Sequence, residues 1–324
     1  MARYAAARFA WLIAVLLAVS AVTFVLGVLA PGDPAVVVFE RTRPGDSPSP
    51  RELDELRRQM GLDRSLPVQY TRWLGGAVRG DLGQSWSTGQ RVATAVRERL
   101  PRTALLAGAA LVLAVAMAIP LGVLAAYRHN TAVDQLCRVV ALAAASLPGF
   151  LVAYLLILYL AVRARVFPAF GFDSAASLAL PALTLALGSA GTLTRFTRAA
   201  VLDVLSAPYL QAGRAKGVPT VRLLFEHALR NAALPVATVI GLSLTGLLGG
   251  AFVVEWIFNW PGLGTLAVQA INSKDYPVIQ GFVLVTAAGC VLVNFVVDLA
   301  YAALDPRVRL TGATGAGSPG GGGL

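Results

Sequence analysis

The ionisable side chains with the most regular spacing lie between residues 209 and 231. Arg222, Glu226 and Arg230 are four residues apart, so a helix through them places opposite charges side by side. The same helix would carry one apolar stripe, made of Val221, Leu224, Phe225, Ala228 and Leu229. This arrangement suits non-covalent docking to another protein, and it suits a solvated loop at a membrane surface equally well.

Two interruptions divide this segment. Pro208 suits the first turn of a short helix, and the Gly-Val-Pro stretch at 217–219 ends that helix before the next one starts. The sequence therefore predicts two short helices joined by an elbow.

Covalent chemistry is not indicated. A Walker A loop needs Gly-Lys followed by Ser or Thr, and neither Lys216 nor Lys274 fits, which excludes ATP hydrolysis by that route. The sequence also contains no GxSxG elbow and no HExxH pair. The histidines and cysteines show no metal-ligand spacing: His129, His227, Cys137 and Cys290. We expect this chain to bind no cofactor and no metal.

The elements that must position the elbow are membrane helices. Six stretches contain no Asp, Glu, Lys or Arg, and each meets the roughly 20-residue length of a membrane-spanning helix. They are residues 9–30, 103–127, 139–162, 174–194, 231–254 and 276–297. The apolar share of 56% and the mean hydropathy of +0.68 favour an all-α polytopic membrane protein with six transmembrane helices. Residues 256–273 are also uncharged, but Asn259, Pro261, Gly262 and Gly264 predict a re-entrant or surface hairpin there.

The short loops set the orientation. With both termini on one side, the termini and short loops of that side hold twelve basic residues: Arg3, Arg8, Arg128, Arg138, Arg195, Arg198, Arg214, Lys216, Arg222, Arg230, Arg307 and Arg309. The opposite short loops hold only Arg163, Arg165 and Lys274, so the positive-inside rule predicts cytoplasmic termini and a cytoplasmic elbow. The net charge of +10 is thus spread over loops, and it does not indicate nucleic-acid binding.

The first apolar stretch exceeds the roughly 7 to 15 residues of a signal-peptide core, so we expect it to be retained as a helix. The segment 31–99 that follows mixes eleven Arg with nine acidic residues and lies outside by parity. A short helix is predicted from Glu52 to Met60, ending near Gly61. The aromatic residues Tyr70, Trp73 and Trp86 suit a scaffold at the membrane surface, either a receptor platform or a cap that packs on the helices.

A few residues within or beside the spans are candidates for transport or packing. Isolated carboxylates are costly in hydrocarbon and tend to face protein or water. We treat Glu255, at the outer end of the fifth span, and Asn294, in the sixth, as candidates for a translocation pathway or gate. Asp298 shares a helix face with Asn294, and we expect it to pair with an arginine. The small residues Gly246 and Gly250 predict close helix packing, and prolines can kink four spans: Pro120, Pro148, Pro181 and Pro235.

Several motifs in order give the chain a resemblance to a known family. These are 31–34 (Pro-Gly-Asp-Pro), 61–63 (Gly-Leu-Asp), 66–70 (Leu-Pro-Val-Gln-Tyr), 73–74 (Trp-Leu), 80–83 (Gly-Asp-Leu-Gly) with Ser85, 214–217 (Arg-Ala-Lys-Gly), 227–232 (His-Ala-Leu-Arg-Asn-Ala), Glu255 with Phe258, 260–264 (Trp-Pro-Gly-Leu-Gly), 275–277 (Asp-Tyr-Pro), Asn294, Asp298 and 305–307 (Asp-Pro-Arg). From the first span to about Leu310, the chain resembles permease subunits of bacterial ATP-binding-cassette importers for dipeptides, oligopeptides and sometimes nickel, specifically the first, B-type permease.

The resemblance implies that the loop between the fourth and fifth spans forms coupling helices, at about 208–230, that dock on an ATPase subunit. It assigns that role to Tyr209, Arg214, Ala215, Lys216, Gly217, Glu226, His227, Arg230 and Asn231. The chain departs from the family pattern at Pro208, where an acidic residue is common, and at Ala212-Gly213, where Thr-Ala is usual.

The resemblance also implies the partners and the location. The partners are a second homologous permease, two ATPase subunits that bind ATP and magnesium, an extracytoplasmic peptide-binding protein, and the bilayer of a bacterial inner or plasma membrane. The expected parts are the cytoplasmic N-terminus and first helix at 1–30, the extracytoplasmic segment at 31–99, a permease core at 100–310 and a disordered tail at 311–324, rich in Gly.

Two other functions fit a six-span protein. A secondary transporter driven by an ion gradient would place ionisable residues at mid-membrane, and the centres of the six stretches contain none. A membrane scaffold would have no water-accessible path between its helices, a difference that cysteine accessibility would reveal.

Overall fold

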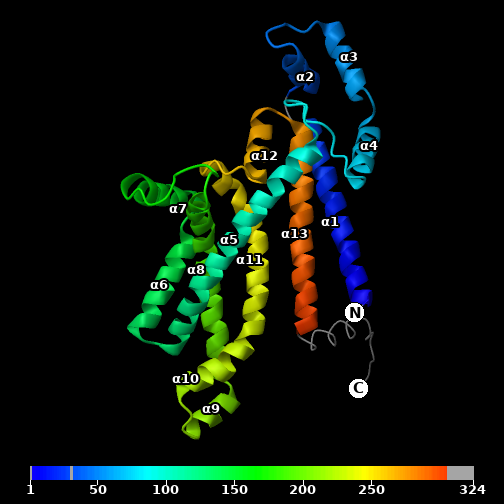
Figure 1. Ribbon diagram of the computed structural model, residues 1–324. Coiled ribbons are helices and arrows are strands. Elements are labelled where there is room, and N and C mark those ends of the chain that lie inside the picture. The colour runs from blue at the N-terminus through cyan, green and yellow to red at the C-terminus, as the bar shows by residue number, and fades with distance from the viewer. Residues whose placement is uncertain (1, 30–31, 305–324) are drawn as a thin grey trace, which may run out of the picture.

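The computed structural model describes residues 2–29 and 32–304. Within those residues the regular elements are helices, apart from one isolated bridge between Gln84 and Arg91 (Figure 1). The all-α prediction is confirmed for this part of the chain. The motif at 305–307 and the predicted tail at 311–324 lie outside the described residues, as does Pro31.

Five of the six predicted spans are found as long apolar helices. They are α1 (Ala2–Leu29), α5 (Val92–Tyr127), α8 (Ala179–Leu205), α11 (Leu229–Ile257) and α13 (Tyr276–Leu304). A 3₁₀ turn, Ala175–Leu178, precedes α8. Each of these helices is long and apolar enough to cross a membrane.

The third predicted span is not a single helix. It is divided into α6 (Ala132–Ser146) and α7 (Gly149–Leu156), which continues as a π-helix over Ile157–Arg163, and the two parts are bent by 102°. The break falls at Leu147, because the ring of Pro148 forces the preceding residue out of the helical region; Leu147 has ψ of 130°. The count of six spans therefore holds only if this bent pair is one of them.

Helix α5 begins earlier than predicted. It has 36 residues and starts at Val92, so the predicted boundary between residues 99 and 100 falls inside one continuous helix. The outer segment and the membrane core therefore share a rigid element.

The core of the bundle is made by α5, α8 and α11. Buried residues from all three pack together, among them Ala110, Leu193 and Leu247. Glycines allow the closest contacts: a Cβ on Gly122 of α5 would lie 2.8 Å from the Thr194 carbonyl oxygen of α8, and one on Gly191 would lie 2.8 Å from the Ala145 amide of α6.

The predicted close packing at Gly246 and Gly250 is wrong within this chain. A Cβ on Gly246 or Gly249 would meet no atom within 4 Å, and one on Gly250 would make only an ordinary contact with Leu185 at 3.4 Å. The spacing was suitable, but the tertiary arrangement turns this side of α11 towards an open groove.

The outer segment forms three short helices, α2 (Pro34–Thr42), α3 (Pro50–Met60) and α4 (Leu66–Val78). The predicted helix ending near Gly61 is confirmed as α3. It starts with a capping box of Ser49 and Glu52 and ends at Gly61, whose φ of 70° suits a residue without a side chain. These helices and the elbow lie at opposite ends of the molecule (Figure 1).

The predicted hairpin after α11 is also confirmed. Residues 258–262 turn the chain, and the ten-residue helix α12 (Leu263–Asn272) packs back against α11 and α13. It is too short to be a span.

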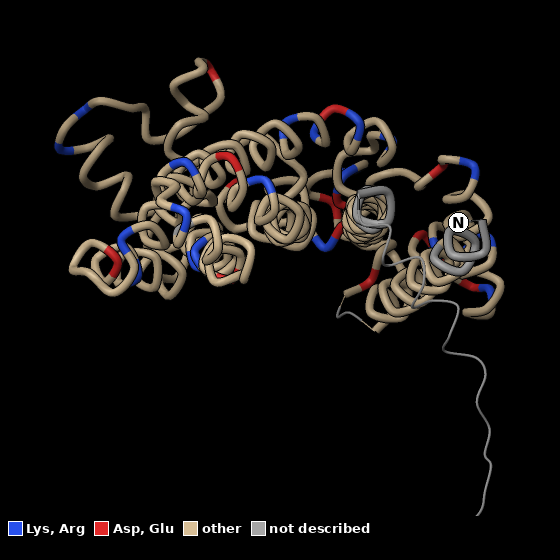
Figure 2. The backbone as a smooth tube through the Cα atoms, turned by 90° about the horizontal axis from the view of Figure 1, so that it is seen from below, with Lys and Arg blue, Asp and Glu red and all other residues tan. Residues whose placement is uncertain are grey.

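Charged residues are concentrated in loops and near helix ends. Figure 2 views the molecule from the end that carries the elbow and shows mostly uncharged helices, with short patches of Lys, Arg, Asp and Glu. The start of α1, the end of α13 and the elbow lie towards this same end (Figure 1).

Candidate functional site

The elbow consists of α9 (Pro208–Ala215), a turn, and α10 (Thr220–Leu223). Pro208 occupies the first position of α9, where its missing N–H is not needed. Gly217, with φ of 82°, ends the helix in a left-handed conformation, and the Val218 amide donates to the Gly213 carbonyl at 3.1 Å. The first helix and the break were therefore predicted correctly.

The second arm differs from the prediction. Helix α10 is followed directly by a π-helix, Leu224–Ala228, and then by α11, so the arm is the extension of the fifth span and not a separate short helix. The wider π turn shifts the register of the face. Leu223, Leu224 and Ala228 are buried, whereas Val221 and Phe225 of the predicted stripe are exposed.

The arms are joined to each other and to the bundle. The Asn231 side-chain amide donates to the Tyr209 hydroxyl at 2.8 Å, which connects the start of α9 to the start of α11. Leu210 is buried in a cluster with residues of α5 and α8, including Ala126 and Val201. Movement of α9 must therefore displace the ends of these helices.

The remaining predicted coupling residues lie on the outside of this elbow. Arg222 and Glu226 form the predicted pair at 3.0 Å. Exposed residues include Tyr209, Ala215, Lys216, Gly217, Glu226, His227, Arg230 and Asn231. Arg214 lies on α9, but its side chain is outside the described part of the structure. The exposed elbow can bind a partner through shape and polar contacts, without covalent chemistry.

A buried ion pair that was not predicted from the sequence stabilises the same end. Asp134 of α6 is 1% exposed and receives two hydrogen bonds of 2.7 Å from Arg198 of α8. The Asn130 amide donates to it at 3.0 Å, and His129 lies 3.5 Å away. An isolated acid at the start of an apolar helix was a possible signal, but its partner is 64 residues away.

At the opposite end, Glu255 holds the hairpin. This residue is fully buried at the end of α11, and its carboxylate accepts the Gly264 amide of α12 at 2.6 Å. Thr103 of α5 accepts the Leu263 amide at 2.8 Å, and the Trp260 indole donates to the Arg102 carbonyl at 3.1 Å. In this arrangement Glu255 faces the hairpin, and its role in a gate stays a prediction.

Asn294 connects two helices. Its side-chain oxygen accepts the Thr245 hydroxyl at 2.9 Å, which pairs α13 with α11. The side chain of Asp298 lies outside the described residues. A role for Asn294 in the pathway also stays a prediction, since its partner is another helix.

A groove with a mixed apolar and hydroxyl lining lies between α7, α8 and α11. Its volume is about 500 Å³. Its lining contains hydroxyls and glycines: Thr184, Ser189, Thr192, Ser243, Gly188 and Gly246. Since small residues leave open space and hydroxyls can bond water or a polar solute, this groove could accommodate either. The sequence does not reveal this groove, because its residues come from three separate segments.

Two family models of known proteins match the chain. The family model described as "Binding-protein-dependent transport system inner membrane component" matches residues 118–310. The corresponding N-terminal model, described as "Binding-prot-dependent transport system membrane comp, N-term", matches residues 1–107.

Curated relatives cover nearly the whole chain. A protein of Brucella suis named as a peptide permease is 40% identical over 322 residues, which are 96% of this chain and all of the relative. The glutathione transport system permease protein GsiC of Escherichia coli is 38% identical and covers 95% of this chain and 99% of its own length.

Among solved structures, a chain of the inward-facing MetNI methionine ABC transporter has the same fold over part of the molecule. The TM-score is 0.57 and the identity 17%, and the match covers 65% of this chain and 96% of that one. At this identity, the likeness concerns the fold alone.

Proposed function

The chain belongs to the family of binding-protein-dependent transport permeases, and we propose that it is the translocation subunit of an ATP-driven importer for di- or oligopeptides. It works with a second permease and two ATPase subunits, which bind ATP and magnesium. An extracytoplasmic peptide-binding protein delivers the substrate.

The exposed elbow is the observation that carries this proposal. A short helix projects beyond the bundle, although it is held there by Leu210 and by the Asn231–Tyr209 hydrogen bond. A solvated loop does not require such buried contacts, whereas a docking element must transmit movement to the membrane helices. If an ATPase docks on this elbow, the elbow, the start of α1 and the end of α13 are on the cytoplasmic side.

Coupling follows from the continuity of the second arm with α11. A push on α9 reaches α11 through Asn231 and through the buried cluster of Leu210, Leu223 and Leu224. Helix α11 also lines the groove shared with α7 and α8. Nucleotide-driven movement of the elbow therefore changes the shape of the groove. This groove is the part of the substrate path that this subunit contributes.

The outer segment serves as the platform for the receptor. Helices α2 to α4 stand at the end opposite the elbow (Figure 1), on the side from which the receptor approaches. The platform would bind the receptor, the groove would admit the substrate, and the elbow would bind the ATPase on the cytoplasmic side.

Copurification tests the assembly. The tagged chain, extracted gently from its own membranes, is expected to bring down a second permease and two ATPases, and the assembly should take up labelled peptides into vesicles only with ATP. A chain that transports alone, driven by an ion gradient, would refute the proposal.

Replacement of Ala215 by Asp tests the docking surface. Ala215 is exposed at the end of α9, and a charge there must be desolvated when the elbow enters a cleft. We expect about tenfold less copurified ATPase, equivalent to about 1.4 kcal/mol, and a similar loss of uptake. Ala132→Asp is the matched control, because Ala132 is exposed at the same end on α6. Equal behaviour of the two variants would argue against docking at the elbow.

Cysteine labelling tests the groove. With Cys137 and Cys290 replaced by Ser, Ser243→Cys is expected to react with a water-soluble maleimide, since Ser243 lines the groove. Leu292→Cys, exposed on the apolar surface of α13, is expected to be protected by lipid. If the Ser243→Cys variant is unreactive in the assembled transporter, the groove is not part of a water-filled path.

A further inference from the structure

Helix α4 packs beside α1, against the part of α1 that is a candidate membrane span. The Tyr70 hydroxyl is 2.8 Å from the hydroxyl of Ser20, which is nine residues before the end of α1, and thus about 14 Å along the helix at about 1.5 Å per residue. Phe24 of α1 also packs on Tyr70 and Trp73. Such aromatic residues favour the border between hydrocarbon and headgroups.

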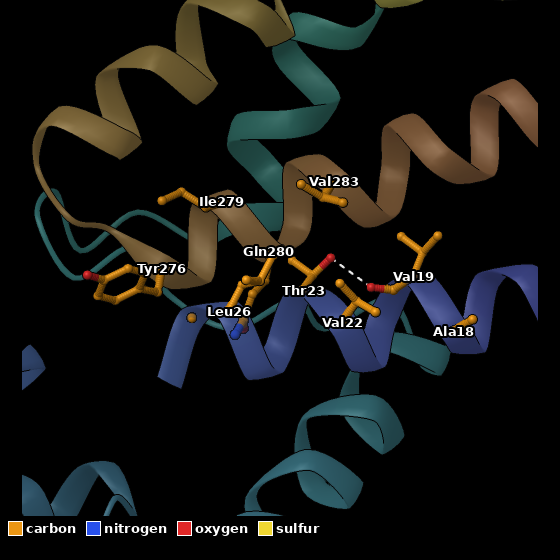
Figure 3. Close-up of a pocket in the computed structure, with 10 residues that line it drawn as sticks. Ala18, Val19, Val22, Thr23, Leu26, Tyr276, Ile279, Gln280 and Val283 are labelled. Carbon is orange, nitrogen blue, oxygen red and sulfur yellow. Dashed lines mark hydrogen bonds between the residues drawn. The ribbon is translucent and has the colours of Figure 1, made fainter. Parts of the chain in front are cut away.

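An apolar groove runs between α1 and α13 along the same part of α1. It has a volume of about 560 Å³, and its lining includes Ala18, Val22 and Leu26 of α1 and Ile279 and Val283 of α13 (Figure 3). These residues belong to two candidate membrane spans. The groove therefore opens at the depth of lipid acyl chains.

A second cavity of about 520 Å³ continues from this groove towards the outer segment. The two share Gly27, Tyr276 and Gln280. Gln280 points from α13 towards α1 at the junction (Figure 3). It is 9% exposed, and its side chain makes no hydrogen bond to a described residue. The buried Nε1 of Trp73, a residue that lines the second cavity, likewise has no hydrogen-bond partner in the described part of the chain.

Two arginines at the second cavity have no acidic partner among the described residues. Arg72 Nη1 and Arg64 Nε lie 3.7 Å and 3.9 Å from the position of a Cβ on Gly61, so both guanidinium groups surround one point. A third, Arg57, is already neutralised by Asp33, to which its Nε donates at 3.1 Å.

The charge of Asp33 is secured by this pairing. Burial raises the pKa of Asp33, but the hydrogen bonds from Arg57 and the Ala35 amide, together with the charge of Arg57, lower it more, and the resulting pKa lies below the ordinary value. The second cavity thus retains an excess of positive charge from Arg64 and Arg72 beside an apolar groove.

We propose that an anionic phospholipid binds here, with an acyl chain between α1 and α13, its ester region at Gln280 and its phosphate at Arg64 and Arg72. Guanidinium groups bind phosphate oxygens through paired hydrogen bonds, and basic pockets between membrane helices suit anionic headgroups. The continuity of an apolar groove with a basic cavity favours a lipid over a soluble anion, which would use the basic cavity alone. The lipid would fill the seam that joins α1 to the bundle.

Lipid analysis of the purified protein tests this proposal. The tagged full-length chain, with the subunits that accompany it, is washed in mild detergent, and retained phosphatidylglycerol and phosphatidylethanolamine are quantified by mass spectrometry. Wild type is expected to retain phosphatidylglycerol preferentially, and R64Q/R72Q to retain at least fivefold less. R51Q/R79Q, which removes two exposed arginines of the same segment away from the cavity, should behave as wild type.

A second pair of variants tests the acyl-chain groove. Val283→Trp fills it from α13 and is expected to reduce retention as strongly as R64Q/R72Q, whereas Leu292→Trp, exposed elsewhere on α13, should not. Added phosphatidylglycerol should raise the melting temperature of delipidated wild type and of both controls, but not of R64Q/R72Q or Val283→Trp.

Four results would overturn the proposal. The first is equal retention by all proteins, and the second is an equal loss in R51Q/R79Q, which would indicate diffuse attraction. The third is displacement of the bound lipid by excess inorganic phosphate. The fourth is binding of a soluble peptide at the arginines with no effect of Val283→Trp. None of these results depends on transport activity.

Discussion

Asp275→Ala is expected to destabilise the outer end of the protein by about 3 kcal/mol or more, because each buried donor left without an acceptor costs about 1 to 3 kcal/mol. The Asp275 carboxylate is 1% exposed and accepts four hydrogen bonds. The donors are the hydroxyls of Ser85 at 2.5 Å and Ser87 at 2.7 Å, and the amides of Trp86 and Ser87, both at 3.1 Å. These bonds fix the outer loop to the start of α13.

Thermal unfolding of the purified protein and protease cleavage near residues 79–91 measure this effect. We expect a lower melting temperature and faster cleavage in that loop. Asp275→Asn retains one carbonyl acceptor but presents an amide to the same donors, so its effect should be intermediate. Asp46→Ala removes an exposed acid of the outer segment and serves as the control. If Asp275→Ala unfolds at the same temperature as Asp46→Ala, the role assigned to Asp275 is wrong.

Gly264→Ala is expected to have an effect of similar size. A Cβ at this position would lie 2.5 Å from the Phe252 Cα and 2.9 Å from the Phe252 carbonyl oxygen, both of which belong to the backbone of α11. Helix α12 would have to move, and the Gly264 amide would lose its bond to Glu255. Overpacking costs about 1 to 3 kcal/mol, and a hydrogen bond to a charged group contributes about 1.5 to 3 kcal/mol.

The matched control is Gly249→Ala. Gly249 lies on α11, where a new Cβ meets nothing within 4 Å. Alanine is the better helix former by about 1 kcal/mol, so this variant should be neutral or slightly stabilised. Yield of monodisperse protein and the melting temperature distinguish the two. A Gly264→Ala protein as stable as Gly249→Ala would mean that α12 does not pack on α11 as described.

The extent of the helices was accessible from sequence. Hydropathy over about 20 residues depends only on neighbours in the chain, and the five continuous spans follow from it. The hairpin before α12 follows from Asn259, Pro261, Gly262 and Gly264, which are also local signals. Capping signals are equally local, which explains why α3, with Ser49, Glu52 and Gly61, and α9, with Pro208 and Gly217, were predicted closely. The same information failed at Leu147, because it did not reveal that the kink at Pro148 would reach 102°.

Some features of the candidate site could likewise be predicted from local sequence, and others could not. The position of the elbow and its Arg222–Glu226 pair follow from local spacing, and the family follows from ordered motifs. The buried face of the second arm could not be predicted from the spacing, since a π turn moved Val221 and Phe225 outward. The glycines of α11 were expected to pack, but the placement of α7 and α8 left a groove beside them.

Residues near one another in the chain are enough to indicate that this protein crosses a membrane, where its five continuous apolar helices lie, and where the elbow occurs. The pairing of Asp134 with Arg198, and that of Asp275 with Ser85, 190 residues away, is visible only in the folded structure. Burial of a carboxylate requires donors, and sequence spacing does not specify which distant segment supplies them.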